Sequence, residues 1–536
     1  MSFRKNNYQQ MSLADSFMGL TSRERKALEN SWAKTFGDEI FPAIDETPFQ
    51  VLYSGHASRP NTPVNVCVGA LIIKELFGLS DDEVVENVLL DPRFQYALHT
   101  TSCVEQPISG KTLSRFRRRC YNYETTYGID LYHNCITALS GKIAKMMGIR
   151  SRIRRMDSMM IAANIKKLSR TELLYTCVAK LAIHLHKHGK DDILEDLEHY
   201  YAADDFNKMF YYSDSSHTDE QVKEILGDAD KLLDRCGNAY DDVTEYQLLV
   251  RCLSEQTVVE NGVRRLWTKE DGGSLSGVMQ SPSDPDATFR TKAGKGHYGY
   301  VANVDESVGE NGSVITDYQY ECNNYSDVQF LKDSLERTAV QDEEATLITD
   351  GAYSSRDNRR LAEEKNINLV TTGINGTQVE DILADFEFSD DGTKVLRCPA
   401  GHEPKSCSYR EQKGYGHCRC SFLITQCAEC PHCKECKANL RKHVAIVTVS
   451  ANAKETVELR RSHSGERFKN LARIRNGVET IPSILRKRYQ VDKMPVRGLI
   501  RSKFFFGCKV AALNFRKLYT FRHQRGHYAQ NPILAG

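Results

Sequence analysis

Long apolar runs are missing from this chain of 536 residues. No stretch approaches the about 20 apolar residues that a membrane-spanning helix needs. The first residues, MSFRKNNYQQMSLADSF, contain no apolar segment that could serve as a secretory signal. We therefore expect no membrane partner and a cytoplasmic location. The 17 cysteines are then expected to be reduced thiols with one metal site, because disulfides belong to small secreted proteins.

An excess of charge of either sign is also missing, since the formal net charge is +1. This average hides a segregation along the chain. Residues 191–260 carry about 19 Asp and Glu against about 5 Lys and Arg, and residues 451–536 carry about 19 Lys and Arg against about 5 Asp and Glu. A basic end of this density fits a polyanionic partner or a solvated charged face, and charge alone does not decide between them. The chain length predicts two or three folding units.

Residues 1–55 read as a polar N-terminal tail with one short helix over 22–36, and residues 56–150 read as a helical block. The helix signals of the block are Thr62 as a cap before Pro63, a stop at Gly78, a capping box of Ser80 and Glu83, starts at Asp91–Pro92 and at Ser109 or Thr112, and an end at Gly148. The helix after Ser109 places Arg115, Arg118 and Arg119 on or near one face. A helical block with a basic helix suits a DNA-binding domain. The alternative is a bundle that only supports the rest of the chain.

The pattern changes at Ser151, and residues 151–536 alternate between strands and helices. A strand containing Asp157 comes first, and an acidic helical insertion over 168–265 follows it. An antiparallel pair joined through Gly309 and Asn311–Gly312, a helix, a strand ending at Asp350, a helix and a last strand complete the series. This is the order of an RNase H-like core. We therefore predict an α/β fold with a mixed sheet in residues 151–536, carrying the helical insertion and a Cys-rich insertion over 380–450.

Two aspartates lie on strands of this predicted core. Asp157 lies within the first strand, and Asp350 ends the apolar strand TLIT just before Gly351. Carboxylates that converge from separate strands can hold a pair of divalent ions for phosphodiester chemistry. An Asp before Gly is also a common turn former, so each residue alone admits that simpler interpretation.

The Cys-rich insertion contains a C-x2-C-x2-C-x2-C run formed by Cys427, Cys430, Cys433 and Cys436. Cys398, Cys407, Cys418 and Cys420 precede it. Paired C-x2-C turns direct thiolates at one tetrahedral zinc ion, which here would be structural. An iron–sulfur site and unliganded thiols are the alternatives.

The segment RNGVETIPSILRKRYQVDKMPVRGL resembles the C-terminal signature of DDE-type transposases of bacterial insertion sequences, Tyr-x2-Arg-x3-Glu-x6-Lys. Arg475, Glu479 and Arg486 stand at its Arg, Glu and Lys positions, and Ala472 stands at the Tyr position. The spacing of four and seven predicts that these three residues share one helical face. Because Pro482 interrupts a helix, we expect the helix to begin or bend there, with Thr480 as a cap.

Other segments resemble the same family in the same order, over some 450 residues. They are FGLSDDEVVENVLLDPRFQYAL with TLSRFRRRC, RMDSMMIAANIKK, SPSDPDATFRTKAGKGHYGYVANV, LITDGAYSSRDNRRLAEEKNI and GLIRSKFFFGCKVAALNFRKL. The resemblance implies a catalytic triad of Asp157, Asp350 and Glu479 that holds two Mg²⁺ or Mn²⁺ ions. It also implies that Arg475 and Arg486 contact DNA, and that zinc is bound by Cys398, Cys427, Cys430 and Cys436.

The implied partner is double-stranded DNA with terminal inverted repeats, bound by a homodimer in the synaptic complex, with the protein on the nucleoid when DNA-bound. The implied activity is metal-dependent cleavage and strand transfer at the ends of an insertion sequence. Three alternatives stay open: an RNase H-like nuclease that cuts without joining, a domesticated transposase that only binds DNA, and a zinc-dependent regulator.

Overall fold

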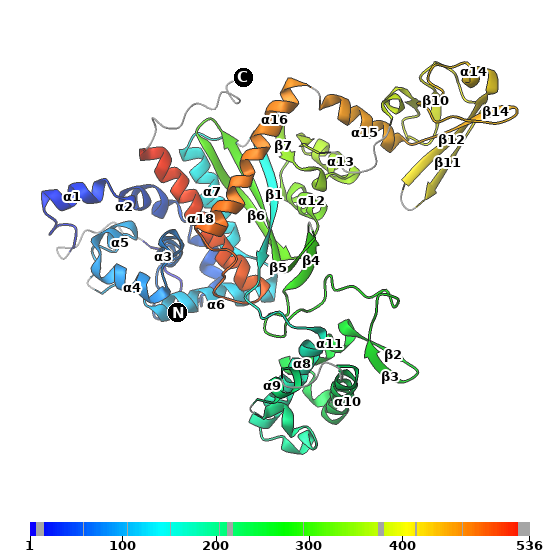
Figure 1. The fold of residues 1–536 in the computed structure, drawn as a ribbon. Coiled ribbons are helices and arrows are strands. Elements are labelled where there is room, and N and C mark those ends of the chain that lie inside the picture. The colour runs from blue at the N-terminus through cyan, green and yellow to red at the C-terminus, as the bar shows by residue number, and fades with distance from the viewer. Residues whose placement is uncertain are drawn as a thin grey trace. The chain divides into compact units, whose positions relative to one another are not determined.

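A computed structural model describes the chain except residues 7–14, 57, 104, 151, 203, 212–217, 293, 374–379, 413–414, 464 and 524–536. The chain folds as two compact units. Figure 1 labels the helices and strands that make them up. The first comprises Met1–Phe330 and Glu479–Gly536, and the second comprises Leu331–Val478. Among the helices described, none is both long and apolar enough to cross a membrane.

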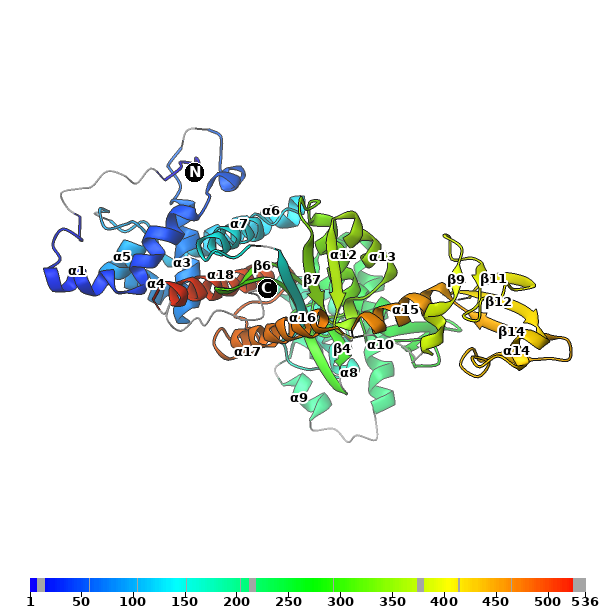
Figure 2. The same cartoon turned by 90° about the horizontal axis from the view of Figure 1, so that it is seen from above.

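The first unit begins with a helical part. Its elements are α1 (Ser22–Glu29), α2 (Trp32–Thr35), η1 (Phe36–Ile40), η2 (Phe41–Ala43), η3 (Thr47–Leu52), α3 (Val64–Phe77), α4 (Asp81–Leu90), α5 (Pro92–Ala97), α6 (Gly110–Tyr127) and α7 (Leu131–Met146). The C-terminal helix α18 (Leu499–His523) runs beside α3 and α7 (Figures 1 and 2). Its segment from Phe504 to Phe515 is buried throughout, so this helix forms the centre of the helical part.

Most of the helix signals in the sequence are confirmed. Gly78 ends α3 in the left-handed conformation with φ 70°, the Ser80–Glu83 capping box starts α4, and Ser109 caps α6. Two expectations are wrong. The helix over 22–36 is split, because Ser31 accepts a hydrogen bond from Ala33 and starts a new helix. Thr62 does not cap α3, because its hydroxyl donates to the carbonyl of Pro107 at 3.2 Å.

The strands of the first unit pair around β5 (Lys295–Gly309). One edge of β5 pairs antiparallel with β1 (Ile153–Ala162), and the other pairs with β4 (Thr288–Lys292) and then β6 (Gly312–Cys322). The partner changes at Gly299, where φ is 143° and a Cβ atom would lie 2.3 Å from the carbonyl oxygen of Ile161. Only glycine fits such a position.

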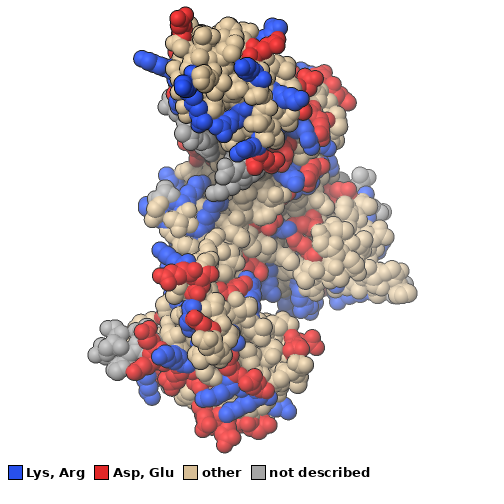
Figure 3. Space-filling model, turned by 90° about the vertical axis from the view of Figure 1, so that its right-hand side faces the viewer, with Lys and Arg blue, Asp and Glu red and all other residues tan. Residues whose placement is uncertain are grey.

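The acidic insertion leaves this unit between β1 and β4. It comprises α8 (Arg170–Lys187), η4 (Asp191–Leu194), η5 (Glu198–Tyr201), α9 (Asp205–Phe210), α10 (Thr218–Cys236), η7 (Gly237–Tyr240), α11 (Thr244–Gln256), β2 (Thr257–Glu260) and β3 (Val263–Leu266). The expected helix around KDDILEDLEHYY is only two 3-10 turns, η4 and η5. Its acidic side chains gather on the lobe at the bottom of Figure 3.

The insertion is closed at its ends by one arginine. Arg170 donates to the carbonyls of Gln256 and Trp267 at 2.6 and 2.8 Å. Its guanidinium also lies 3.9 Å from the centre of the Trp267 ring, a cation–π geometry. This joins the first helix of the insertion to the segment that leaves it.

The second unit continues the α/β pattern. It contains α12 (Asp327–Arg337, beginning just before the unit), β7 (Ala345–Thr349), η8 (Gly351–Tyr353), α13 (Arg356–Glu364) and β8 (Ile367–Thr371). Strands β7 and β8 pair in parallel. The predicted order of strand, hairpin, helix, strand, helix and strand is therefore found as β1, β5–β6, α12, β7, α13 and β8. The mixed α/β fold class, with antiparallel and parallel strands in RNase H-like order, is confirmed.

The rest of the second unit contains the cysteines. Its elements are η9 (Asp381–Asp385), β9 (Glu387–Phe388), β10 (Val395–Arg397), β11 (Ser406–Gln412), β12 (Tyr415–Leu423), α14 (Ile424–Ala428), β13 (Asn439–Leu440), β14 (Val444–Val449), α15 (Ala451–Ser462) and α16 (Glu466–Asn476). Strands β11, β12, β14 and β13 form an antiparallel sheet in that order. The turn η10 (Gly477–Glu479) ends this stretch, and α17 (Thr480–Lys487) returns the chain to the first unit.

Candidate functional site

Asp157 lies in the middle of β1, opposite Val304 of β5, and it is partly exposed. Its Oδ1 accepts a hydrogen bond from the backbone N–H of Ser158 at 3.0 Å. The predicted placement within a strand is confirmed. The strand fixes the position of this carboxylate, because a paired backbone has little freedom to move.

A buried ion cluster that the sequence reading missed anchors β1 beside Asp157. Arg155 donates to Glu306 of β5 at 2.7 Å, and Lys517 of α18 donates to the same carboxylate at 2.5 Å. Burial alone would raise the pKa of Glu306, but attraction to Lys517 and Arg155 outweighs it and lowers the pKa. The adjacent Arg154 pairs with Asp305 in the same way. The only sequence signal was a pair of arginines inside an apolar strand.

Asp350 is the N-cap residue of η8, directly after β7. Its Oδ1 accepts the backbone N–H of Ala352 at 2.8 Å, so the turn-forming interpretation holds for one oxygen. Its Oδ2 lies 3.7 Å from a guanidinium nitrogen of Arg475 on α16, and the side chain is 38% exposed. An ion pair of that length and exposure contributes only about 0–1 kcal/mol. The Oδ2 side of the carboxylate therefore stays accessible to a stronger ligand.

Glu479 is exposed and lies in η10, between α16 and α17. The expected interruption of the helix is confirmed, but Glu479 occupies the N-cap position and Thr480 is the first helical residue. Pro482 falls in the first turn of α17, where a missing N–H costs no hydrogen bond. Arg475, Glu479 and Arg486 therefore lie on three successive elements, α16, η10 and α17, and their sharing of one helical face stays a prediction.

Arg486 is engaged within the first unit. Its guanidinium donates to the carbonyl of Met160 on β1 at 2.8 Å and to Asp492 at 3.2 Å. Asp492 in turn accepts the backbone N–H of Ala162 at 3.0 Å. These contacts fix α17, which follows Glu479, against the end of the strand that carries Asp157. In this structure Arg486 therefore positions the two elements.

The three carboxylates belong to different units. Asp157 and Glu479 lie in the first and Asp350 lies in the second. Within the described ranges, no three His, Cys, Asp or Glu side chains already stand together as a metal site. The meeting of the triad therefore remains a prediction.

The three arginines expected on α6 have different surroundings. Arg115 and Arg118 are exposed. Arg119 is partly buried, with its guanidinium 4.6 Å from the centre of the Tyr53 ring and one nitrogen 3.6 Å from the sulfur of Met1. The exposed pair is thus placed for a partner, whereas Arg119 packs inside the helical part.

The thiols of the Cys-rich insertion cluster around one small cavity. Five of them line it: Cys398, Cys427, Cys430, Cys433 and Cys436. Burial and the neighbouring thiols together raise the pKa of Cys436 to about 12. A cation would relieve both effects, because it stabilises the thiolates. Thiolates are donors that a thiophilic metal such as zinc prefers, but within the described ranges these thiols do not already stand together as a metal site. His402 and His432 line the same cavity.

Three other cysteines, Cys407, Cys418 and Cys420, lie on the strands β11 and β12 of the antiparallel sheet. Cys418 and Cys420 are buried on β12, and Cys420 lies 3.3 Å, sulfur to sulfur, from its cross-strand neighbour Cys407. They pack with Phe386, Phe422 and the valines of β14. Their role here is to fill the core of the insertion.

Two protein-family models match the chain. A transposase domain of the DUF772 type matches residues 26–119, and a "Transposase DDE domain" matches residues 397–519. The first includes the α6 arginines, and the second includes the cysteine run, Arg475, Glu479 and Arg486. Asp157 and Asp350 lie outside both matches. No curated protein matches the chain.

Among solved structures, the chain is similar to that described as "Cryo-EM structure of piggyBac transposase synaptic complex with hairpin DNA (SNHP)". The identity is 7% over 98% of this chain and 78% of that chain, and the TM-score of 0.28 is too low to establish a common fold.

The two family matches, one near each end of the chain, define its class: it is a DNA transposase. More narrowly, the C-terminal match is to a transposase DDE domain, and the two matches in this order are those expected of a DDE-type transposase of insertion sequences, an enzyme that acts on DNA. The resemblance carried by the sequence motifs is thereby confirmed.

Proposed function

We propose that Asp157, Asp350 and Glu479 together hold two Mg²⁺ or Mn²⁺ ions, with which the enzyme cleaves and joins DNA at the ends of its element. The observation that carries this proposal is the position of Asp350. It follows a core strand, one oxygen is fixed by the N–H of Ala352, and the other lies on its accessible side near Arg475. DDE domains use divalent metals, and hard cations prefer such carboxylate oxygens.

The proposed reaction has two balanced steps. Water attacks a phosphorus at the element's end, the bond from phosphorus to the 3′ oxygen breaks, and a 3′-hydroxyl is released. That hydroxyl then attacks a second phosphodiester, in the opposite strand or in target DNA, and a new 3′-hydroxyl leaves. Paired ions supply the Lewis acidity for both the attacking and the leaving oxygens.

The arginines of the signature have different proposed roles. Arg475 lies beside Asp350 and is suited to a phosphate next to the ions, since a guanidinium can bind phosphate oxygens in pairs. Arg486 acts through Met160 and Asp492 to hold Glu479 and Asp157 in register. We propose no direct DNA contact for Arg486.

Replacing Asp350→Asn tests the metal site. We expect the rate of Mg²⁺-dependent cleavage of a duplex carrying the element's end to fall by roughly 10²–10³ or more, while binding of that duplex is retained. Asp357→Asn is the matched control, because Asp357 is an exposed carboxylate on α13 in the same unit. Cleavage by the Asp350 variant at the control's rate would remove Asp350 from the active site.

A pre-cut duplex distinguishes a transposase from a nuclease that only cuts. We expect joining of a terminal 3′-hydroxyl to target DNA, and no joining when the same end carries a 3′-deoxy sugar. We also propose that a homodimer pairs two inverted-repeat ends. Mass measurement of the complex should then give two chains and two ends, and a complex of one chain with one end that still joins both ends would contradict this.

We further propose that Cys398, Cys427, Cys430 and Cys436 bind one structural zinc ion. The support is their common cavity. Purified protein should contain about one zinc per chain. Cys430→Ser should lower this content, whereas Cys433→Ser should not, because Cys433 is the spare thiol. Equal zinc loss in the two variants would reject this choice of ligands, and iron with visible absorbance would favour an iron–sulfur site.

A further inference from the structure

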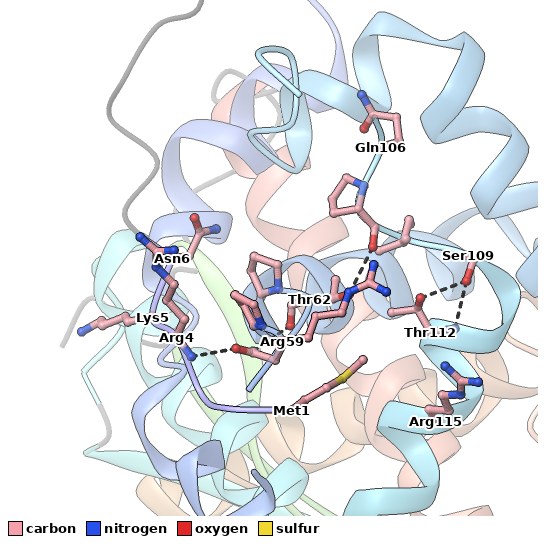
Figure 4. A pocket seen from close by; sticks show the side chains of 15 residues that line it. Met1, Arg4, Lys5, Asn6, Arg59, Thr62, Gln106, Ser109, Thr112 and Arg115 are labelled. Atoms are coloured by element: carbon pink, nitrogen blue, oxygen red, sulfur yellow. Dashed lines mark hydrogen bonds between the residues drawn. The ribbon is translucent and has the colours of Figure 1, made fainter. Parts of the chain in front are cut away.

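A basic pocket lies in the helical part of the first unit, and none of the three candidate carboxylates lines it. It encloses about 680 Å³, within the range of about 300–1,000 Å³ typical of ligand sites. Its walls come from the first residues of the chain, the segment before α3 and the start of α6 (Figure 4). The cationic side chains lining it are Arg4, Lys5, Arg59 and Arg115. We call this the N-terminal pocket.

Backbone pairing fixes the position of these cations. Ser2 donates its N–H to the carbonyl of Arg59 at 3.2 Å, and Asn61 donates its own to Ser2 at 3.1 Å. The N–H of Arg4 donates to the Asn61 side chain at 2.7 Å. Arg4 and Arg59 are therefore held beside each other although 55 positions separate them in the chain. Arg115 comes from α6 on the other side of the pocket (Figure 4).

Three of the four cations that line the pocket have no ion-pair partner in the described part of the chain. Its lining contains no Asp or Glu. The described ion pairs involve none of Arg4, Arg59 and Arg115, and all three side chains are exposed. By contrast, Arg117 on the same helix α6 pairs with Asp81. Like charges gathered around one hollow repel each other, so an anion bound there would gain from all of them.

The lining also indicates which part of a nucleic acid would bind. Among the described residues that line it, none is aromatic and could stack on a base, and the uncharged members are Met1, Ile108, prolines, small hydroxyls and amides. Arginines bind phosphate oxygens through paired N–H donors. Phosphate contacts position a protein on DNA without reading its sequence.

We propose that the N-terminal pocket binds the phosphate backbone of DNA through Arg4, Arg59 and Arg115. This rests on the chain being a DNA transposase and adds a second DNA contact to the proposed catalytic one. The phosphates come from the element's own end or from target DNA. Lys5 is left out of the set, because its charge also acts on Asp45, whose pKa is lowered mainly by hydrogen bonds from Thr47 and partly by Lys5.

The test is the triple variant Arg4→Gln, Arg59→Gln, Arg115→Gln in the full chain. Fluorescence anisotropy of a labelled duplex, without divalent metal, gives the affinity at a series of salt concentrations. Each lost phosphate contact lowers the slope of log affinity against log salt by about 0.9, so we expect a decrease of about 2–3 and an affinity loss of at least about tenfold. Because the three side chains are exposed, the variant should keep its fold and melting temperature.

The matched control removes the same charge elsewhere in the helical part. Arg23, Lys26 and Lys145 are exposed and lie outside the pocket. The variant Arg23→Gln, Lys26→Gln, Lys145→Gln should change the salt slope by less than about 1. A triple pocket variant with the control's slope would overturn the proposal, as would a wild-type chain that binds no duplex.

Two duplexes distinguish the source of the phosphates. A loss confined to the duplex with the element's terminal sequence assigns the pocket to that end, and an equal loss on an unrelated duplex of the same length assigns it to backbone contacts shared with target DNA. Both results support the proposal. The salt dependence of DNA binding is measured independently of the cleavage rate. If the Asp350→Asn variant cleaves normally while the pocket variant shows the expected decrease in salt slope, only the metal-site proposal fails.

Discussion

The two insertions of this protein solve the problem of a small fold in different ways. The acidic insertion encloses a large aliphatic core, with Leu173, Leu174, Leu181, Leu185, Leu232 and Leu249 among its buried residues. The Cys-rich insertion has a core of only Phe386, Val395, Cys418, Cys420, Phe422, Val447 and Val449, with further cysteines packed against it. Apolar burial can stabilise the first without help, whereas a core as small as the second generally needs a metal or a covalent link.

The interactions that hold each insertion closed differ in the same way. The acidic insertion is closed by Arg170, which binds Gln256 and Trp267. The Cys-rich insertion brings Cys398 to the Cys427–Cys436 run across one cavity. The hydrogen bonds of a guanidinium hold two segments together without a cofactor. A set of thiols holds its segments together strongly only when the thiols bind a common metal ion. The comparison therefore predicts one metal-dependent insertion and one metal-independent insertion.

Removing zinc should have the largest effect. Structural zinc contributes an apparent free energy of about 10–16 kcal/mol near neutral pH, so a chelator should unfold the Cys-rich insertion and leave the acidic one folded. Limited proteolysis checks this, with new cleavage expected between residues 398 and 436 and none between 168 and 265. Equal protection of both segments after zinc removal would break the comparison.

Leu181→Ala should have the next largest effect. Leu181 is fully buried in α8, and truncation leaves a cavity that costs about 2–5 kcal/mol. Hydrogen exchange should become faster across α8, α10 and α11, with zinc content unchanged. Ile183→Ala is the matched control on the same helix, since that side chain is 36% exposed. Similar exchange rates in the two variants would show that this core does not stabilise the insertion.

Arg170→Gln should have a smaller effect. It removes two hydrogen bonds to backbone carbonyls, a third to the side chain of Gln256 at 2.9 Å, and a cation–π contact, for a loss of roughly 1–3 kcal/mol. We expect faster exchange around Thr257 and Trp267, where the insertion ends. Arg251→Gln, which breaks an ion pair within α11, serves as the control and should change little.

Ser169→Ala should have the smallest effect, about 1 kcal/mol. The hydroxyl of Ser169 accepts a hydrogen bond from the backbone N–H of Glu172 at the start of α8. The carboxylate of Glu172 in turn accepts a hydrogen bond from the backbone N–H of Ser169. Urea titration followed by tryptophan fluorescence, in a Trp32→Phe background that leaves Trp267 as the tryptophan observed, would measure the loss. A loss above about 3 kcal/mol would mean that more than the cap is affected.

The structural features that the sequence predicted correctly are local ones. The stop at Gly78, the capping box of Ser80 and Glu83, and the strand around Asp157 depend on neighbours within a few positions, and all are confirmed. The expected cap at Thr62 was wrong, because the hydroxyl found a partner 45 positions away. The one-face arrangement of Arg475, Glu479 and Arg486 stays a prediction, because the 3-10 turn η10 lies between the two helices that carry the arginines.

The sequence by itself determined the class of this protein, the order of its elements and which carboxylates and thiols are candidates, since these depend on residue type and spacing. Only the tertiary structure decided what each charged side chain binds. Arg486 braces β1, Arg119 packs on Tyr53, and Arg155 pairs with a buried glutamate that α18 also contacts. It also placed Arg4 beside Arg59. Such partners come from distant parts of the chain, and packing, rather than local spacing, brings them together.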